Sequence, residues 1–318
     1  MTTENTLKAV DKVEILTLQD NYIDITAMDG SAVVTRANPL KDGEICASIL
    51  AEHGFSALVR TTAEVAMHTL LFDFGFSEDG AARNAATLGV DMTQVEAAAL
   101  SHGHSDHTGG MVKLTAMIGR VNVPFVVHPA AFRSPRYLKF GEEFKVYFPK
   151  LTREMVHQAG LSVIETEKPR LMLNNTVLFL GGIPRDTDFE KGWPLAHCQK
   201  NGKEQWDPIE DDASVVMNLK DKGLVILSGC AHVGIINTVI HAIDVTGIDK
   251  IHAVMGGFHL TGPFFEPIID RTIQELQKLN PDYVIPTHCT GRKATIEMEK
   301  QMPDKFILNM AGTKLTFV

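Results

Sequence analysis

Residues 101–110 read SHGHSDHTGG and place three histidines and one aspartate within six positions, although the 318-residue chain holds only 13 histidines. Neutral imidazole and carboxylate are the ligands that zinc, iron and manganese share. His102, His104, Asp106 and His107 are therefore candidate metal ligands. The alternative, a polar surface turn that binds nothing, does not account for this density. The stretch predicts a metal site.

The flanks of this stretch place it at the end of a strand. The apolar run 95–100 before it is typical of a buried strand, and residues 111–118 after it are typical of a helix. Glycines at 103, 109 and 110 let the backbone bend close to an ion. In α/β architectures the carboxyl ends of strands usually carry the chemistry, so the placement fits a functional site.

Three later histidines repeat the pattern, because each follows an apolar strand and one or more small or turn residues. They are His232, His259 and His288. One such histidine alone is more often a core or surface residue, but adjacent strand ends converge in space. We therefore expect His232 and His288 to be ligands, and His259 to be a further ligand or a catalytic proton donor. Five other histidines are expected not to touch metal: His68, His128, His157, His241 and His252.

These motifs together resemble the dihydropteroate-synthase-like branch of the metallo-β-lactamase superfamily. Members are called 7,8-dihydropterin-6-ylmethyl-4-(β-D-ribofuranosyl)aminobenzene 5′-phosphate synthases, or metal-dependent hydrolases. The resemblance spans Val13 to Thr290 and implies an α/β (α+β) fold, a four-layer αββα sandwich with a two-metal site. The motifs that carry it are EHGFS (52–56), SHGHSDHTGG (101–110), SGCAH (228–232), GGFHL (256–260) and PTHCTG (286–291).

The resemblance also divides the ligands between two divalent ions, with zinc expected first and iron or manganese as alternatives. His102, His104 and a later histidine would hold one ion, and Asp106, His107 and His288 the other. Asp106 could also orient the attacking water as a catalytic residue.

Three further positions keep two interpretations each. Where the superfamily usually has its later ligands, this chain has Glu210-Asp211-Asp212 and Ser228-Gly229-Cys230. Whether Asp211 is a metal ligand stays open, and Cys230 is either a thiolate ligand or a small buried residue. The resemblance makes Asp73 the acid that supports the metal loop from behind, whereas its position also suits a turn.

Hydrophobic periodicity predicts a single domain over residues 1–318, with a loose lead-in over residues 1–12 and an irregular, lid-like insertion around 130–210. The expected strands are 13–18, 45–50, 56–60, 67–74, 95–100, 123–127, 176–180, 214–219, 224–227, 251–255, 283–285 and 314–318, and the expected helices are 79–88, 111–118, 235–245, 265–279 and 292–301.

Within the insertion, Arg133, Arg136 and Arg185 are candidates to hold an anionic group, and Trp193 or Tyr137 to stack on a ring. The alternative is a solvated insertion that its tryptophans anchor to the core.

Composition limits the location and the partners of the chain. A hydrophobic content of 44% with 22% charged residues is ordinary for a globular protein. The first twelve residues lack the pattern of a secretory signal, there is no run of about 18 apolar residues, and the four cysteines show no framework spacing. We therefore expect a cytoplasmic protein without a membrane span. A net charge of −9 argues against a nucleic-acid partner, and a homo-oligomer is left open.

Three functions remain as hypotheses. The first is hydrolysis of a small anionic phosphate or carboxylic ester, lactone or thioester by a metal-activated water. The second, implied by the resemblance, is a synthase of a methanopterin-type pathway that forms a C–N bond between a dihydropterin diphosphate and an aminobenzene ribofuranosyl phosphate. The third is a non-enzymatic metal or ligand sensor, which has no need for an open two-metal site.

Overall fold

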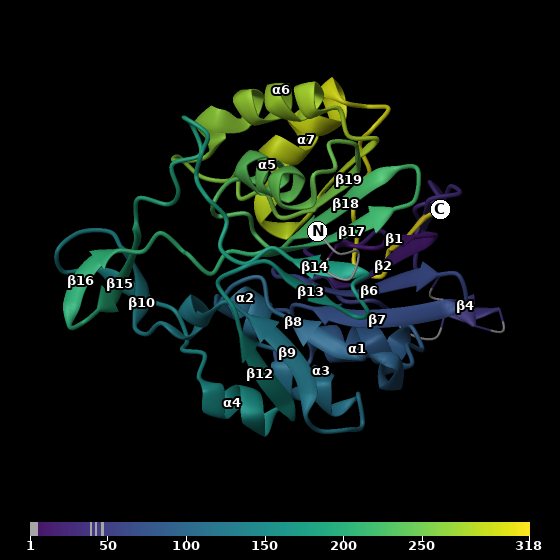
Figure 1. Cartoon of the computed structure of the whole chain (residues 1–318), viewed down its shortest axis with the longest axis horizontal. Helices are drawn as coiled ribbons and strands as arrows, with labels where there is room; N and C mark the ends of the chain where they lie inside the picture. The colour runs from purple at the N-terminus through teal and green to yellow at the C-terminus, as the bar shows by residue number, and fades with distance from the viewer. Residues whose placement is uncertain (1–5, 39, 42, 46–47) are drawn as a thin grey trace.

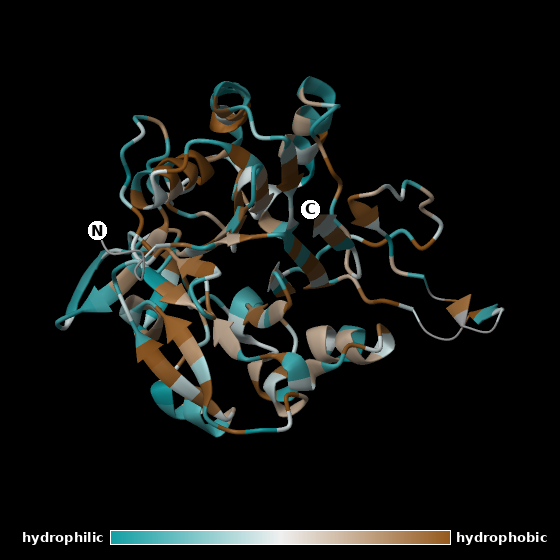
Figure 2. Cartoon of the chain, turned by 45° about the vertical axis from the view of Figure 1, so that its right-hand side comes forward, coloured by the Kyte–Doolittle hydropathy of each residue, from teal (hydrophilic) through white to brown (hydrophobic). Residues whose placement is uncertain are grey.

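The computed structural model describes residues 6–38, 40–41, 43–45 and 48–318. Two large β-sheets lie face to face, and helices cover the outer side of each (Figure 1). This is the four-layer αββα sandwich that the resemblance implies. Figure 2 shows that hydrophobic residues dominate the strands in the middle of the molecule. No helix in the described part of the chain is long and apolar enough to cross a membrane.

One sheet has eight strands in the order β12-β9-β8-β7-β6-β2-β21-β3. Both of its faces are buried, as β2 shows: Val13 and Ile15 face the core between the sheets, whereas Leu16 and Leu18 face the helices. The strands are β2 (Lys12–Gln19), β3 (Val34–Thr35), β6 (Ser56–Ala63), β7 (Ala66–Phe72), β8 (Ala97–Ala99), β9 (Val123–Val127), β12 (Leu161–Glu165) and β21 (Lys314–Phe317). Helices α1 (Gly80–Thr87), α3 (Met111–Ala116) and α4 (Arg153–Gln158) lie on its outer side (Figure 1).

The other sheet has seven strands, in the order β13-β14-β17-β18-β19-β20 with β1 paired to β17. In β18, Val225 and Leu227 face the core between the sheets, whereas Leu224 and Ile226 face the helices. The strands are β1 (Ala9–Val10), β13 (Arg170–Met172), β14 (Val177–Phe179), β17 (Ser214–Leu219), β18 (Gly223–Ser228), β19 (Ile251–Gly256) and β20 (Tyr283–Pro286). Helices α5 (Ile235–Thr246), α6 (Ile269–Leu279) and α7 (Arg292–Gln301) cover it (Figure 1).

The segment 130–210 contains more regular structure than its sequence pattern indicates. It holds α4, β12, β13, β14 and a separate four-stranded sheet that projects to the left in Figure 1. The strands of that sheet are β11 (Lys145–Tyr147), β10 (Arg136–Lys139), β15 (Ala196–Lys200) and β16 (Lys203–Trp206), in that order.

Two expectations near the N-terminus were wrong. Residues 9–12 are not a loose lead-in, because Ala9 and Val10 pair with Asn218 and Leu219 of β17. The strand expected at 45–50 is absent where it can be described, because residues 48–50 have no regular structure and β5 (Glu44–Ile45) ends before them. Residues 46–47, which include Cys46, lie outside the described residues.

The strand directions gather the predicted ligands at one edge of the sandwich. Strands β18, β19 and β20 run parallel, and so do β7, β8 and β9. Because the carboxyl ends of parallel strands share an edge, the loops after β8, β18, β19 and β20 meet there.

The core between the sheets yields a stability prediction. Leu70 of β7 is fully buried in this core, whereas Val65 in the turn before β7 is 98% exposed. Leu70→Ala should lower the free energy of unfolding by about 2–5 kcal/mol, because it leaves a cavity. Val65→Ala should change it by less than about 0.5 kcal/mol. Urea unfolding followed by circular dichroism measures both, and equal effects would contradict the assigned core.

Candidate metal centre

The loop after β8 aims its side chains by simple backbone geometry. His104 is extended, with φ −75° and ψ 152°, and it caps the one-turn helix α2 (Ser105–Thr108). In an extended segment, residues two apart point to the same side, so His102 and His104 face one point. The turn α2 then brings Asp106 and His107 beside them. Gly103 is required, because a Cβ there would lie 2.4 Å from the carbonyl oxygen of Ala131.

Three imidazoles form what we call the first cluster: His102, His104 and His232. The Nε2 atom of His102 lies 3.0 Å from Nδ1 of His104 and 3.2 Å from Nε2 of His232. All three rings are buried. The nitrogens thus converge on one point from two loops that lie far apart in the sequence.

The first cluster fits a metal ion in both geometry and charge. A tetrahedral zinc ion with nitrogen ligands at about 2.0–2.1 Å holds neighbouring ligand atoms roughly 3.3 Å apart, close to the distances found here. Burial lowers the pKa of His104 to about 4 and holds the pKa values of His102 and His232 well below their usual value. The three rings are therefore neutral at neutral pH and keep a lone pair for a cation.

Four side chains form the second cluster: Asp106, His107, Cys230 and His288. The Nε2 atom of His107 lies 3.2 Å from Sγ of Cys230 and 3.3 Å from Nε2 of His288. Asp106 Oδ2 lies 3.5 Å from the same His107 atom and 3.9 Å from Nε2 of His288. The two clusters therefore contain all six side chains that the sequence predicts as ligands, in the predicted division, and Cys230 joins them.

Before an ion binds, the second cluster differs from the first, because His107 and Cys230 keep protons that a bound ion would displace. Burial by itself raises the pKa of Asp106, but the neighbouring His107 outweighs it, and the pKa of the carboxyl lies well below its usual value. Burial likewise lowers the pKa of His107, but Asp106 and Asp73 outweigh it and hold the pKa well above its usual value. Burial raises the pKa of the Cys230 thiol. A bound ion would favour its thiolate form, because coordinated thiols lose their proton.

Asp73 supports the loop of residues 101–107 from behind, as the resemblance implies, and it lies in an irregular segment after β7 and not in a turn. It is fully buried, with a φ of 58°. Its carboxylate accepts hydrogen bonds from the backbone and hydroxyl of Ser101, both at 2.7 Å, and from Nδ1 of His107 at 2.6 Å. Because a carboxylate can only accept, Nδ1 of His107 carries the proton and Nε2 is left to face the cluster.

Two of the predicted substrate-binding arginines are engaged elsewhere. Arg136 is buried, donates to Asp207 at 2.7 Å and binds Asp211 through both terminal nitrogens. Arg133 pairs with Asp207 and Glu210. A guanidinium already paired with carboxylates has little left for a substrate anion. Both groups instead hold the segment around Asp211, which in turn accepts the N–H of Gly103 at 2.8 Å. Their role in anion binding stays a prediction.

The other two predicted substrate-binding residues, Trp193 and Arg185, both lie beside His232 of the first cluster. Trp193 lies over the first cluster, with its ring centroid 6.0 Å from that of His232 and the rings within 10° of parallel. Arg185 has no carboxylate within salt-bridge distance among the described side chains. It donates a hydrogen bond to the carbonyl of His232 at 3.4 Å. Its Nε atom is buried and has no hydrogen-bond partner among the described residues.

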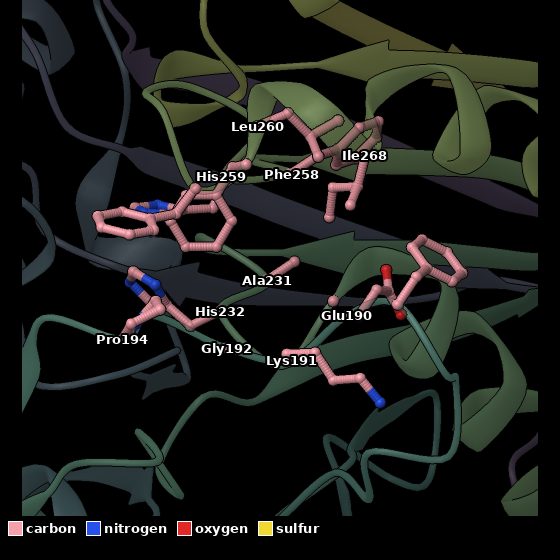
Figure 3. Close-up of a pocket in the computed structure, with 14 residues that line it drawn as sticks. Glu190, Lys191, Gly192, Pro194, Ala231, His232, Phe258, His259, Leu260 and Ile268 are labelled. Atoms are coloured by element: carbon pink, nitrogen blue, oxygen red, sulfur yellow. The ribbon is translucent and has the colours of Figure 1, made fainter.

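His259 lies at the wall of a pocket beside the first cluster. Its ring centroid is 4.2 Å from that of His232, and both histidines line a pocket of about 140 Å³. Figure 3 shows the two imidazoles at one end, Glu190 toward the other, and the apolar residues Phe258 and Ile268 along the upper side.

Sequence reasoning missed several residues of the site. His53 is 59% exposed, and its Nε2 atom lies 3.6 Å from Asp106 Oδ2. The sequence does contain a signal for His53, because this residue belongs to the EHGFS motif (52–56). That motif supported the resemblance, but no role was assigned to its histidine. Phe148 stacks on His104 at 4.3 Å between ring centroids, and Asp20 accepts the N–H of His288 at 2.9 Å. Neither carries a local sequence signal.

The five histidines expected to avoid metal take no part in the clusters found among the described residues. Two of them pair with a carboxylate away from the site. His68 Nδ1 lies 3.0 Å from Glu96, and His252 Nδ1 lies 2.8 Å from Asp282.

The Asp73 contacts predict a loss of metal affinity. Asp73→Asn keeps the shape of the side chain but replaces one accepting oxygen with a donor, so Ser101 or His107 loses its partner. Zinc affinity, measured by competition with a chromogenic chelator, should fall about 10–100-fold. Glu96→Gln at the His68 pair is the matched control and should bind zinc like the parent protein. Unchanged affinity of Asp73→Asn would contradict the supporting role.

Known proteins share both the sequence and the architecture. Residues 52–185 match the model of the metallo-beta-lactamase superfamily. The 7,8-dihydropterin-6-methyl-4-(beta-D-ribofuranosyl)-aminobenzene-5'-phosphate synthase of Methanocaldococcus jannaschii is 30% identical over 84% of this chain and 90% of its own. An uncharacterised protein of the same organism is 31% identical over 82% of this chain and 93% of its own.

Solved structures agree on the fold. The crystal structure of a metal-dependent hydrolase of the beta-lactamase superfamily superposes with a TM-score of 0.71 at 24% identity, over 95% of this chain and 98% of that one. The metallo-beta-lactamase fold protein YhfI from Bacillus subtilis superposes with a TM-score of 0.51 at 11% identity, over 96% of this chain and 100% of that one. From this combined likeness, the chain belongs to the metallo-beta-lactamase superfamily.

Proposed function

We propose that this enzyme hydrolyses a small anionic substrate with one divalent ion in each of the two clusters. The observation that supports this most is the contact between the clusters: the rings of His102 and His107 lie 4.4 Å apart between centroids. Ions held by these clusters would be neighbours, as in two-metal hydrolytic sites, where the ions lie roughly 3.5–4 Å apart. Zinc suits the mixed nitrogen, oxygen and sulfur donors best.

Side chains beside the two clusters are suited to the remaining steps of hydrolysis. A pair of divalent ions, when bound, supplies Lewis acidity and lowers the pKa of water to about 7. Asp106 is suited to orient that water, because its carboxylate accepts hydrogen bonds and its side chain is 16% exposed. His259 lines the adjoining pocket, where it is placed either to contact the substrate or to hold an ion.

The pocket limits the size of the substrate. Its volume of about 140 Å³ is close to that of a cavity that holds benzene, roughly 150 Å³. Apolar side chains form its middle, among them Phe258, Leu260 and Phe265. We therefore expect one ring of the substrate to lie in the pocket while its anionic group lies at the ions.

The second candidate function is that of the synthase relative. Its support is the 30% identity that extends over most of both chains. In such a reaction a C–N bond forms as diphosphate leaves, and the same ligand set would hold the ions that stabilise the leaving group. An aminobenzene ring would also suit a pocket of this size and lining.

One prediction tests the ligand set. His288→Ala should remove metal from the second cluster and abolish most turnover, because no other described side chain replaces its nitrogen beside Cys230 and His107. His241→Ala, on helix α5 and outside the clusters, should keep both. Elemental analysis and activity are measured on protein produced in metal-replete medium. A His288→Ala protein with full metal and full activity would show that another residue completes the site.

A substrate panel separates the two functions. Metal-loaded enzyme is offered a phosphomonoester, a phosphodiester, a lactone and a thioester, each carrying an aromatic ring. Turnover of at least one, lost on chelation and restored by zinc, is the expected result. Condensation of a dihydropterin diphosphate with an aminobenzene ribofuranosyl phosphate, without hydrolysis of the panel, would favour the synthase. Structured RNA should not be cleaved, because the net charge of −9 opposes its binding.

A further inference from the structure

A third group of metal-binding side chains lies against the second cluster. Cys230, His259 and Cys289 each offer one donor atom, and the three atoms lie within 4.8 Å of one another. The residues follow β18, β19 and β20, so the same meeting of strand ends assembles them. Cys230 belongs to both groups, because its Sγ also lies 3.2 Å from Nε2 of His107 and of His288.

The backbone is shaped around the sulfur of Cys289. A Cβ on Gly257 would lie 2.3 Å from this sulfur and 2.9 Å from the ring of His288, so only glycine fits there. The thiol donates to the carbonyl of Cys230 at 3.6 Å. Cys289 is only 4% exposed and forms no disulfide. These contacts fix the sulfur beside Cys230.

The ring of His259 is held toward the two sulfurs by three aromatic neighbours. Its centroid lies 4.2 Å from His232, 5.0 Å from Trp193 and 4.6 Å from Phe265, which meets it at 90°. The backbone of His259 has a φ of 44°, a conformation that costs a non-glycine residue free energy. Its buried Nδ1 atom has no hydrogen-bond partner among the described residues. A buried donor or acceptor without a partner is costly unless a ligand satisfies the ring.

We propose that Cys230, His259 and Cys289 form a third metal position, which takes a thiophilic ion such as zinc and shares Cys230 as a bridging thiolate with the second cluster. Two sulfurs and one imidazole nitrogen are a donor set for zinc or copper(I) and a poor one for magnesium, calcium or manganese. Three protein ligands leave a fourth coordination position open, and His259 lines the 140 Å³ pocket.

The two proposed hydrolytic ions do not require this position. His102, His104 and His232 carry the first ion without sulfur, and Asp106, His107 and His288 give the second three donors besides Cys230. Removing Cys289 therefore subtracts a ligand from the third position alone. The proposal concerns metal content and can be tested without a known substrate.

The test counts zinc in reconstituted protein. Metal-free full-length protein is loaded with zinc, passed over a desalting column and analysed for zinc per chain. We expect about three ions for the parent protein and about two for Cys289→Ser and for His259→Gln. The matched control is Cys198→Ser, since Cys198 is also buried and free but lies in β15 of the projecting sheet; it should retain three. Cobalt-loaded Cys289→Ser should also lose part of the near-ultraviolet thiolate charge-transfer band.

Parent protein that binds no more than two zinc ions, with Cys289→Ser and His259→Gln binding the same number, would overturn the proposal. Circular dichroism melting establishes that each variant is folded, and His259→Gln carries the test if Cys289→Ser is not. Two zinc ions with full hydrolysis would refute only this third position. Three zinc ions without hydrolysis of any panel substrate would count only against the proposed function.

Discussion

Four buried carboxylates each hold one stretch of the loops that carry the candidate ligands, and the geometry of the two clusters depends on them. Asp73, Asp211, Asp212 and Asp20 accept the backbone N–H groups of Ser101, Gly103, Val233 and His288, at 2.7 to 2.9 Å. Each acceptor is no more than 1% exposed. Hydrogen bonds to an ionised acceptor are stronger than neutral ones, and a buried carboxylate deprived of its donors is costly. The loops are therefore held in place by the protein before any ion binds.

The carboxylates differ in what balances their charge. Arg136 outweighs the effect of burial at Asp211, so the pKa of that carboxyl lies well below its usual value. Burial raises the pKa of Asp20 to about 6 and that of Asp212 to about 7. Charge is thus concentrated at Asp211 behind the first cluster, whereas Asp20 and Asp212 lie closer to neutral. The arrangement limits the cost of placing several acids around one buried site.

The segment 130–210 is part of the metal centre as well as an appendage. Arg136 in β10 connects the projecting sheet to Asp211 and, through it, to the backbone beside His102. Phe148 covers His104, and Trp193 covers His232. A change in this segment would alter the position of the imidazoles and the walls of the pocket together. The candidate metal ligands and the walls of the pocket are therefore physically linked in this protein.

The sequence by itself determined the candidate ligand types, their place at strand ends and most strands of the two large sheets, but not β1, β3, β12, β13 or helix α4. These features depend on short-range patterns: the spacing within residues 101–110, and apolar runs that end in histidine. The tertiary structure alone decided which distant residues support and complete the site. Arg136 meets Asp211, and Cys230 meets His107, across long stretches of chain. Such partners leave no local signal, because their contact arises only when both sheets pack and bring their strand ends to one edge.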